Sequence, residues 1–114
     1  TGVQTCALPI YKHEHPNSFI SGVIYFQTDS TQDKITFHRA GYKQLQLATN
    51  QFDIYNSDSW WFNVKTKGIV VFPSSLTHHV ENVTADETRI SLAFNTFIKG
   101  TLGDNKSLTE FKNA

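Results

Sequence analysis

GIVVFPSSLTHHVENVTADETRISLAFNTF, residues 68–97, is the stretch that decides the fold. It opens with a short apolar run that is typical of a buried strand, and Pro73 with two serines ends that run. After a short second strand around His78, the small and polar residues 84–87 indicate a turn. Polar and apolar residues then alternate from residue 89 onward with the period of a strand. The stretch therefore predicts three strands separated by two polar breaks.

The alternation after residue 88 gives the third strand two different faces. The apolar face is predicted to pack on a core, and the other carries Arg89, Ser91 and Asn95. An arginine on the inner side of a strand is costly unless it meets an anion. One alternative is a surface ion pair with Asp86 or Glu87, which contributes only about 0–1 kcal/mol. We prefer a bidentate clamp on a ligand carboxylate, because a guanidinium fits that geometry and Ser91 follows on the same face.

Three histidines can supply a metal site. On an extended chain His13 and His15 point to the same side, and His78 stands on the second strand of the stretch above. A His-x-His pattern alone is a weak metal signal, because a solvated loop shows it as well. His79 has to point away from His78, and is therefore predicted to lie on the surface or to support the site from outside. His38 is predicted to face solvent near the end of its strand. Three imidazoles on one side would hold a metal and leave coordination positions open.

The rest of the chain reads as further short strands joined by polar loops. Residues 18–27 are apolar on both faces, so this run is predicted to be a central strand. Other predicted elements are strands over 11–15, 35–39 and 60–64, an ambiguous segment over 43–55 that is a candidate lid, and a short terminal helix or tail from Ser107 to Glu110. Several short strands separated by turn signals indicate an antiparallel sandwich or barrel.

Three motifs taken together resemble a known family. They are His13-x-His15-Pro-x-Ser-x-x-Ser21-Gly22-Val-x-Tyr25, Phe72-Pro-Ser-Ser-Leu-x-His78-x-Val and Arg89-Ile-Ser91-Leu-x-Phe-Asn95-Thr-Phe. In this order they are similar to the iron(II)- and 2-oxoglutarate-dependent oxygenases of the small phage and bacterial group, which are relatives of the prolyl hydroxylases. The resemblance covers residues 11 to about 98. It implies an all-β domain, the jelly roll or double-stranded β-helix.

The resemblance also implies cofactors and the residues that bind them. Iron(II) would bind His13 and His78, and O2 would be the co-substrate for hydroxylation of an unidentified substrate. The far carboxylate of 2-oxoglutarate would bind Arg89, with Ser91 and Tyr25 beside it, although Tyr25 can equally be an ordinary core aromatic. The wider superfamily has His-x-Asp/Glu where this chain has a second histidine. Either that histidine, His15, is the third metal ligand, or water fills the position.

Two other interpretations stay open. One is a cupin-like metal- or sugar-binding jelly roll without oxygenase activity, because an all-histidine site suits zinc, copper and nickel as well as iron. The other is a structural domain of a phage particle whose site is vestigial. Convergence of the three histidines and the arginine in one cavity would favour the oxygenase.

Length and charge limit the number of domains and the kinds of partner. With 114 residues the chain forms at most one domain. Its formal net charge is zero, so no basic surface indicates nucleic-acid binding, and no apolar run is long enough to predict a membrane-spanning helix. The single Cys6 excludes an internal disulfide, and we expect a reducing compartment, the cytoplasm of a bacterial or phage-infected cell. The substrate and the oligomeric state are not predicted.

The first ten residues, TGVQTCALPI, fit nothing that follows them. They resemble a translated sequencing-adapter peptide of the kind found in metagenomic assemblies, and such segments are excluded from fold reasoning. We therefore predict that residues 1–10 are non-native and pack poorly. Residues 11–114 would then be the C-terminal part of a larger native chain, and the N-terminal part of that chain, including the first jelly-roll strand, would be missing here. The alternative is that this segment is a short native strand.

Overall fold

The computed structural model describes residues 10–46, 48–83, 86–104, 106–107 and 109–111. Within these residues the regular secondary structure consists of strands, with no helix. The strands are β1 Ile10–His13, β2 Ile20–Gln27, β3 Lys34–His38, β4 Ser59–Asn63, β5 Ile69–Pro73, β6 His78–Val80, β7 Ile90–Asn95, β8 Gly100–Leu102 and β9 Thr109–Phe111. The predicted terminal helix is therefore wrong, because Thr109–Phe111 pairs with Gly100–Leu102 as an antiparallel hairpin. In the described part of the chain, no helix could cross a membrane.

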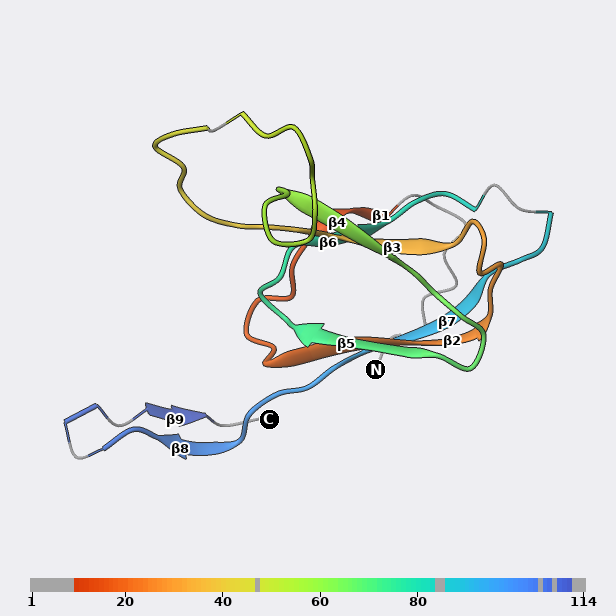
Figure 1. Ribbon diagram of the computed structural model, residues 1–114. Coiled ribbons are helices and arrows are strands. Elements are labelled where there is room, and N and C mark those ends of the chain that lie inside the picture. The colour runs from red at the N-terminus through yellow and green to blue at the C-terminus, as the bar shows by residue number, and fades with distance from the viewer. Residues whose placement is uncertain (1–9, 47, 84–85, 105, 108, 112–114) are drawn as a thin grey trace.

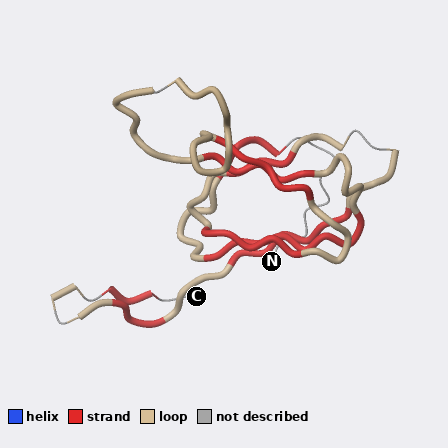
Figure 2. The backbone as a smooth tube through the Cα atoms, in the orientation of Figure 1, coloured by secondary structure: helices blue, strands red, loops and turns tan. Residues whose placement is uncertain are grey.

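Two antiparallel sheets form the body of the protein. One has the strand order β1-β6-β3-β4 and the other has the order β5-β2-β7. The sheets lie face to face in two layers, and the loops that join them gather at the ends (Figures 1 and 2). From β1 to β7, chain neighbours belong to opposite sheets, except for β3 and β4, which pair with each other in one sheet. The fold is thus the all-β jelly roll that the resemblance implied.

Strand β2 is the centre of its sheet, as its two apolar faces predicted. It pairs with β5 on one side and with β7 on the other. Gly22 of β2 lies opposite Val71 of β5 and Phe94 of β7. A Cβ atom at this position would lie 2.4 Å from the Phe94 ring and 2.9 Å from the Val70 carbonyl oxygen. Glycine at this position therefore leaves the space that the Phe94 ring occupies.

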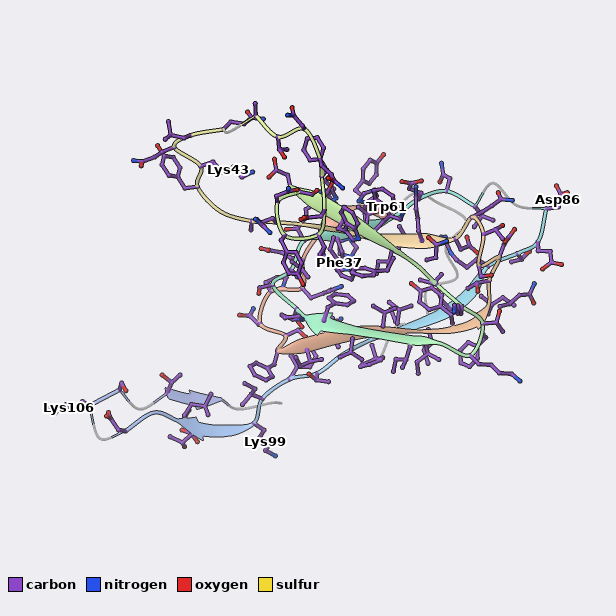
Figure 3. All side chains as sticks on the ribbon, viewed as in Figure 1. Phe37, Lys43, Trp61, Asp86, Lys99 and Lys106 are labelled. Carbon is purple, nitrogen blue, oxygen red and sulfur yellow. The ribbon has the colours of Figure 1, made fainter. Side chains whose placement is uncertain are left out.

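The core between the sheets is small and combines aromatic with aliphatic side chains. Its buried members are Tyr25, Ile35, Val64 and Phe72. Phe37 is packed against them and projects from β3 into the space between the layers (Figure 3). The inner faces of β2, β3 and β5 supply most of these side chains, and the site described below shares the same interior.

Strand β7 turns its apolar face away from this core, which corrects the prediction. Ser91 is opposite Tyr25, a buried inner residue, whereas Leu92 is opposite Ile24 on the outer face. Ile90 is 45% exposed. The alternation was therefore read correctly, but the polar face is the inner one. This arrangement points the Arg89 end of the strand inward.

Two segments extend from the body. The long connection between β3 and β4 forms no strand among its described residues, and its aromatic side chains Tyr42, Phe52 and Tyr55 are exposed. The hairpin of β8 and β9 contacts none of the other described strands and lies apart from the two sheets (Figure 1). Residues 1–9, in the predicted non-native segment, lie outside the described residues. The last residue of that segment, Ile10, begins β1 and pairs with Val80.

Candidate functional site

Three histidines converge on one side of the sandwich. Antiparallel pairing of β1 with β6 places His13 directly opposite His78. One ligand nitrogen each of His13, His15 and His78 lies within 4.8 Å of the other two. The ring centroids are 4.4 Å apart for the first pair and 5.0 and 5.2 Å apart for the two pairs with His15. This is close enough for one ion to contact all three rings.

Backbone carbonyls fix the tautomers of two of these rings. The Nδ1 atom of His13 lies 2.7 Å from the Tyr11 carbonyl oxygen, and that of His78 lies 2.9 Å from the Leu76 carbonyl oxygen. A carbonyl only accepts, so each Nδ1 has to carry the proton and donate it. In the neutral ring this leaves the Nε2 lone pair free. Both imidazoles are thus oriented as metal ligands usually are.

His15 reaches the cluster from beyond the end of β1. The strand ends at His13, and the predicted Pro16-Asn17 turn follows, with Asn17 in the left-handed region at a φ of 65°. The backbone N–H of His15 donates to the Ser74 carbonyl oxygen over 2.9 Å. Strand alternation alone therefore does not position His15. A backbone bond to the loop after β5 does.

A chain of buried hydroxyl groups holds that loop in place. The Oγ atom of Ser74 lies 2.7 Å from those of Ser18 and Ser21. Ser21 donates in turn to the Oδ1 atom of Asn95 over 2.7 Å. Ser21 and Ser74 are fully buried, so these bonds replace lost contacts with water. Sequence reasoning missed this network, since its members are widely separated and serine alone is a weak signal.

Burial keeps the His78 ring neutral. Its residue is only 4% exposed, and its ring packs on Phe72 and Phe37 with centroids 4.6 and 6.2 Å away. Desolvation lowers the pKa of His78 to about 4, against the opposing effect of the bond to the Leu76 carbonyl. Desolvation and the nearby His13 also lower the pKa of His15. Neutral rings have the lone pairs that a metal requires.

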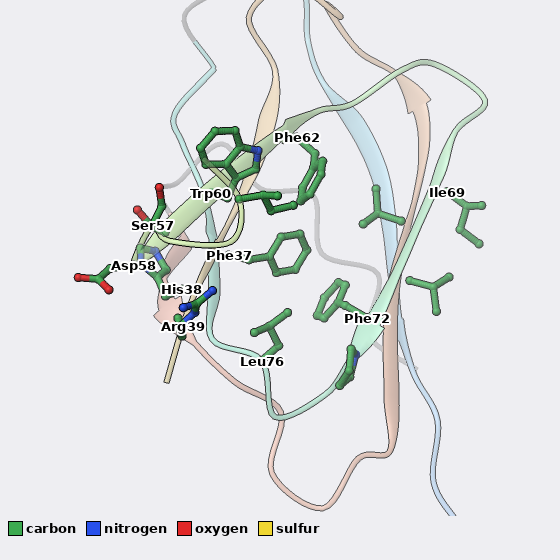
Figure 4. Close-up of a pocket in the computed structure, with 15 residues that line it drawn as sticks. Phe37, His38, Arg39, Ser57, Asp58, Trp60, Phe62, Ile69, Phe72 and Leu76 are labelled. Carbon is green, nitrogen blue, oxygen red and sulfur yellow. The ribbon is translucent and has the colours of Figure 1, made fainter. Parts of the chain in front are cut away.

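An apolar cavity of about 680 Å³ lies on the far side of those phenylalanines (Figure 4). Phe37, Phe62 and Phe72 face one another across it, and Trp60 closes one side. Its size falls within the range of small-molecule sites, about 300–1,000 Å³. The three clustered histidines and Arg89 do not line it. It is therefore a pocket separate from the histidine cluster and is not the metal centre.

Arg89 lies inside the sandwich and meets a carboxylate there. Its side chain is 7% exposed, and its Nη1 atom lies 3.1 Å from the Oδ1 atom of Asp33, which is 4% exposed. Its Nη2 atom donates to the Glu81 carbonyl oxygen over 3.2 Å. The acidic partners proposed from sequence, Asp86 and Glu87, are not the ones it contacts. Sequence reasoning missed Asp33, because it closes a polar loop far from Arg89 in the chain.

The Tyr25 hydroxyl lies in the same region and lacks a partner. Tyr25 is 1% exposed, and its hydroxyl accepts or donates no hydrogen bond among the described residues. Desolvation raises the pKa of Tyr25 to about 12, which nearby Arg89 opposes and nearby Asp33 reinforces. Ser91 is the residue directly opposite Tyr25 on β7. A buried, unpaired hydroxyl beside a guanidinium is the setting in which a polar ligand group would be held.

The remaining histidines, His38 on β3 and His79 on β6, form a pair on the outer side of the four-stranded sheet. The His38 Nε2 atom lies 2.8 Å from the His79 Nδ1 atom, and the rings stack with centroids 5.0 Å apart. His79 therefore points away from the cluster, as predicted. His38 lies on this outer side at the end of β3, where it is half-buried against the His79 ring.

A comparison with protein families agrees with this geometry. Residues 8–95 match the family described as "Putative 2OG-Fe(II) oxygenase". No curated protein matches the chain. The matched region includes the first two motifs, the third motif as far as Asn95, and the histidine cluster with Arg89, and it covers most of the sequence. This chain belongs to the 2OG-Fe(II) oxygenase family.

Proposed function

We propose that the chain is an iron(II)- and 2-oxoglutarate-dependent dioxygenase whose metal ligands are His13, His15 and His78. The observation that carries this proposal is the convergence of three imidazoles, with one nitrogen of each within 4.8 Å of the others. Imidazole is a good ligand for iron(II), and three protein ligands leave open positions for a cofactor and for O2. The free Nε2 atoms of His13 and His78 fit this role.

The cofactor would lie between the histidines and Arg89. In this proposal the guanidinium anchors the far carboxylate of 2-oxoglutarate, and the hydroxyls of Tyr25 and Ser91 donate to it. Arg89 contacts the carbonyl of Glu81, which lies three residues after His78 in the chain. Three residues of extended chain span roughly 10 Å. This separation between His78 and the Arg89 contact is suited to a five-carbon dicarboxylate. The unpaired Tyr25 hydroxyl supports this assignment, because such a ligand would satisfy it.

The protein and its cofactor would divide the chemistry. When bound, iron(II) and 2-oxoglutarate would enable oxidation by O2: one oxygen atom would enter succinate as the cofactor loses CO2, and the other would convert a substrate C–H bond to C–OH. The chain itself fixes the imidazole tautomers through the Tyr11 and Leu76 carbonyls. Phe37 and Phe72 keep water from one side of His78. The chemical class of the substrate is not assigned.

Anaerobic titration tests this function. Iron(II) is added to the protein, 2-oxoglutarate follows, and optical absorbance is recorded at each step. We expect a new visible band that requires both additions. Arg89→Ala should weaken 2-oxoglutarate binding while iron binding stays nearly unchanged, whereas His78→Ala should abolish both. Equal loss of both in Arg89→Ala would mean that Arg89 is structural.

The all-histidine donor set favours one rival, a cupin-like metal site without oxygenase activity. In that case zinc or nickel would bind as well as iron(II), and 2-oxoglutarate would produce no new band. The same titration therefore separates the two functions.

A further inference from the structure

We propose that Asp33 is the resting counter-ion of Arg89 and that its charge lowers the affinity of the site for 2-oxoglutarate. This inference rests on the proposed role of Arg89 as the carboxylate anchor. It concerns the pair at the inner end of the cofactor site, where the Asp33 Oδ1 atom and the Arg89 Nη1 atom lie 3.1 Å apart.

The surrounding loop holds the Asp33 carboxylate in position. Its Oδ2 atom accepts the backbone N–H of Asp29 over 2.9 Å. The Asp33 backbone is fixed at both ends, since its N–H donates to the Asp29 carbonyl and its carbonyl accepts the Val64 N–H. Asp33 therefore cannot swing aside when a ligand arrives. Leaving the guanidinium would also strand a buried charge without a partner.

The cofactor would consequently have to share Arg89 with Asp33. A guanidinium has five N–H donors, and the contacts to Asp33 and to the Glu81 carbonyl engage one nitrogen each. Donors are left for a second carboxylate. However, that carboxylate would meet an arginine whose charge is already neutralised, and it would lie near a like charge in a region shielded from water.

The pair therefore serves the cofactor-free and the cofactor-bound states in opposite ways. At rest, Asp33 neutralises a buried cation and fixes its direction. In the complex, the same charge opposes the incoming carboxylate. A neutral side chain of the same shape at residue 33 should make 2-oxoglutarate bind more tightly, while ligands without a far carboxylate should not respond.

The test uses Asp33→Asn and the control Glu81→Gln. Both substitutions remove one negative charge close to Arg89, but the Glu81 carboxylate pairs with Lys34 at the surface and its side chain is 53% exposed. Calorimetric titrations under anaerobic conditions with manganese(II) present would measure the affinity for 2-oxoglutarate and for pyruvate. Pyruvate has the same 2-oxo acid group but no far carboxylate.

We expect Asp33→Asn to bind 2-oxoglutarate about tenfold more tightly than the native chain, because a nearby like charge in a shielded site is removed. Its pyruvate affinity and both affinities of Glu81→Gln should stay within about twofold of the native values, as expected for a screened surface charge. Unchanged or weaker 2-oxoglutarate binding in Asp33→Asn would overturn the inference, and so would an equal gain for pyruvate.

Two further outcomes are informative. If the native chain binds 2-oxoglutarate but Arg89→Ala binds it equally well, the proposed anchor is wrong and the inference about Asp33 is overturned with it. If Asp33→Asn does not fold alone, it is refolded with manganese(II) plus either 2-oxoglutarate or pyruvate. Recovery with 2-oxoglutarate only would support the inference, and equal recovery or none would contradict it.

Discussion

Asp33 and Arg89 join the two sheets through the interior of the sandwich. Asp33 stands just before β3 in one sheet, Arg89 stands just before β7 in the other, and a 3.1 Å ion pair connects them. Both side chains are more than nine-tenths buried. The pair therefore has a structural effect that is separable from any role in binding a cofactor.

Breaking this pair should destabilise the protein more than removing it completely. Arg89→Met leaves the Asp33 charge buried and unpaired, and should lower the free energy of unfolding by about 3–5 kcal/mol. Adding Asp33→Asn to that variant removes the orphaned charge, so part of the loss should be recovered. Urea unfolding of the two single variants and the double variant measures the coupling. Strictly additive losses would mean that the two charges do not stabilise each other.

The histidine cluster should respond differently from the outer histidine pair. His13→Ala and His78→Ala should each lower iron(II) affinity by more than about 100-fold, beyond the effect of losing a residue that only supports a ligand. His79→Ala is the control, because this ring binds His38 on the outer side of the sheet. Anaerobic iron(II) titration provides the measurement.

His15→Ala decides the third ligand in the same titration. We expect its iron(II) affinity to fall about as far as that of His13→Ala. If affinity survives intact and only turnover falls, the three-histidine proposal is wrong and His15 contacts the substrate or a bound water.

Tyr25→Phe should separate stability from cofactor binding. The native hydroxyl is buried without a partner, so its removal should raise the free energy of unfolding of the cofactor-free protein by up to about 1 kcal/mol. The same change should weaken 2-oxoglutarate binding if the hydroxyl donates to the cofactor. Thermal unfolding with and without manganese(II) and 2-oxoglutarate measures both effects. A variant that is less stable and binds equally well would show that Tyr25 is an ordinary core aromatic.

The Tyr25 hydroxyl should also make the free energy of unfolding depend on pH in the alkaline range. The pKa of Tyr25 is raised to about 12 in the folded protein, against 10.0 in the unfolded chain. Its contribution is fully present below pH 10, and is lost between pH 10 and about 12 as the unfolded state alone releases the proton. The loss is up to about 2–3 kcal/mol, from a shift near two units. Urea unfolding across this range should show a shallower decline for Tyr25→Phe than for the native chain.

Ser74→Ala tests the hydroxyl network beneath His15. The substitution leaves the hydroxyls of Ser18 and Ser21 with one fewer partner each, at a cost of about 1–3 kcal/mol in the free energy of unfolding. The backbone bond from His15 to residue 74 is retained, so iron(II) affinity should fall by no more than about tenfold. Ser75→Ala is the matched control, because that side chain is exposed. Equal stability of the two variants would show that the network is unimportant.

Much of the fold could be predicted from local pattern, but the orientation of faces could not. The apolar run of β2 and the alternation of β7 identified both strands. Which face of β7 turns inward depends on its register with β2, where Ser91 meets Tyr25, and one strand alone does not encode that register. The helix alternative for residues 107–110 was wrong for a similar reason: Thr109–Phe111 is a strand because it pairs with Gly100–Leu102.

The candidate site divides in the same way. His13 and His15 lie in one short motif and His78 in another, so their convergence could be predicted from the sequence. The structure brings one nitrogen of each ring within 4.8 Å of the others. Their role as ligands stays a prediction. Asp33 gave no signal, because an acidic residue that closes a polar loop looks like any solvated turn until the fold brings Arg89 to it. The backbone bond that positions His15 is likewise a contact between distant loops.

The pairing of β1 with β6 has a consequence for how the protein folds. His13 and His78 become neighbours only when β1 and β6, which are far apart in the sequence, pair with each other, and the other contacts of β6 and β7 are also distant in sequence. Such high contact order slows folding, because the entropy of closing long loops is lost before the contacts form. We therefore expect the histidine cluster to assemble late, so that metal uptake during refolding reports the last step of chain closure.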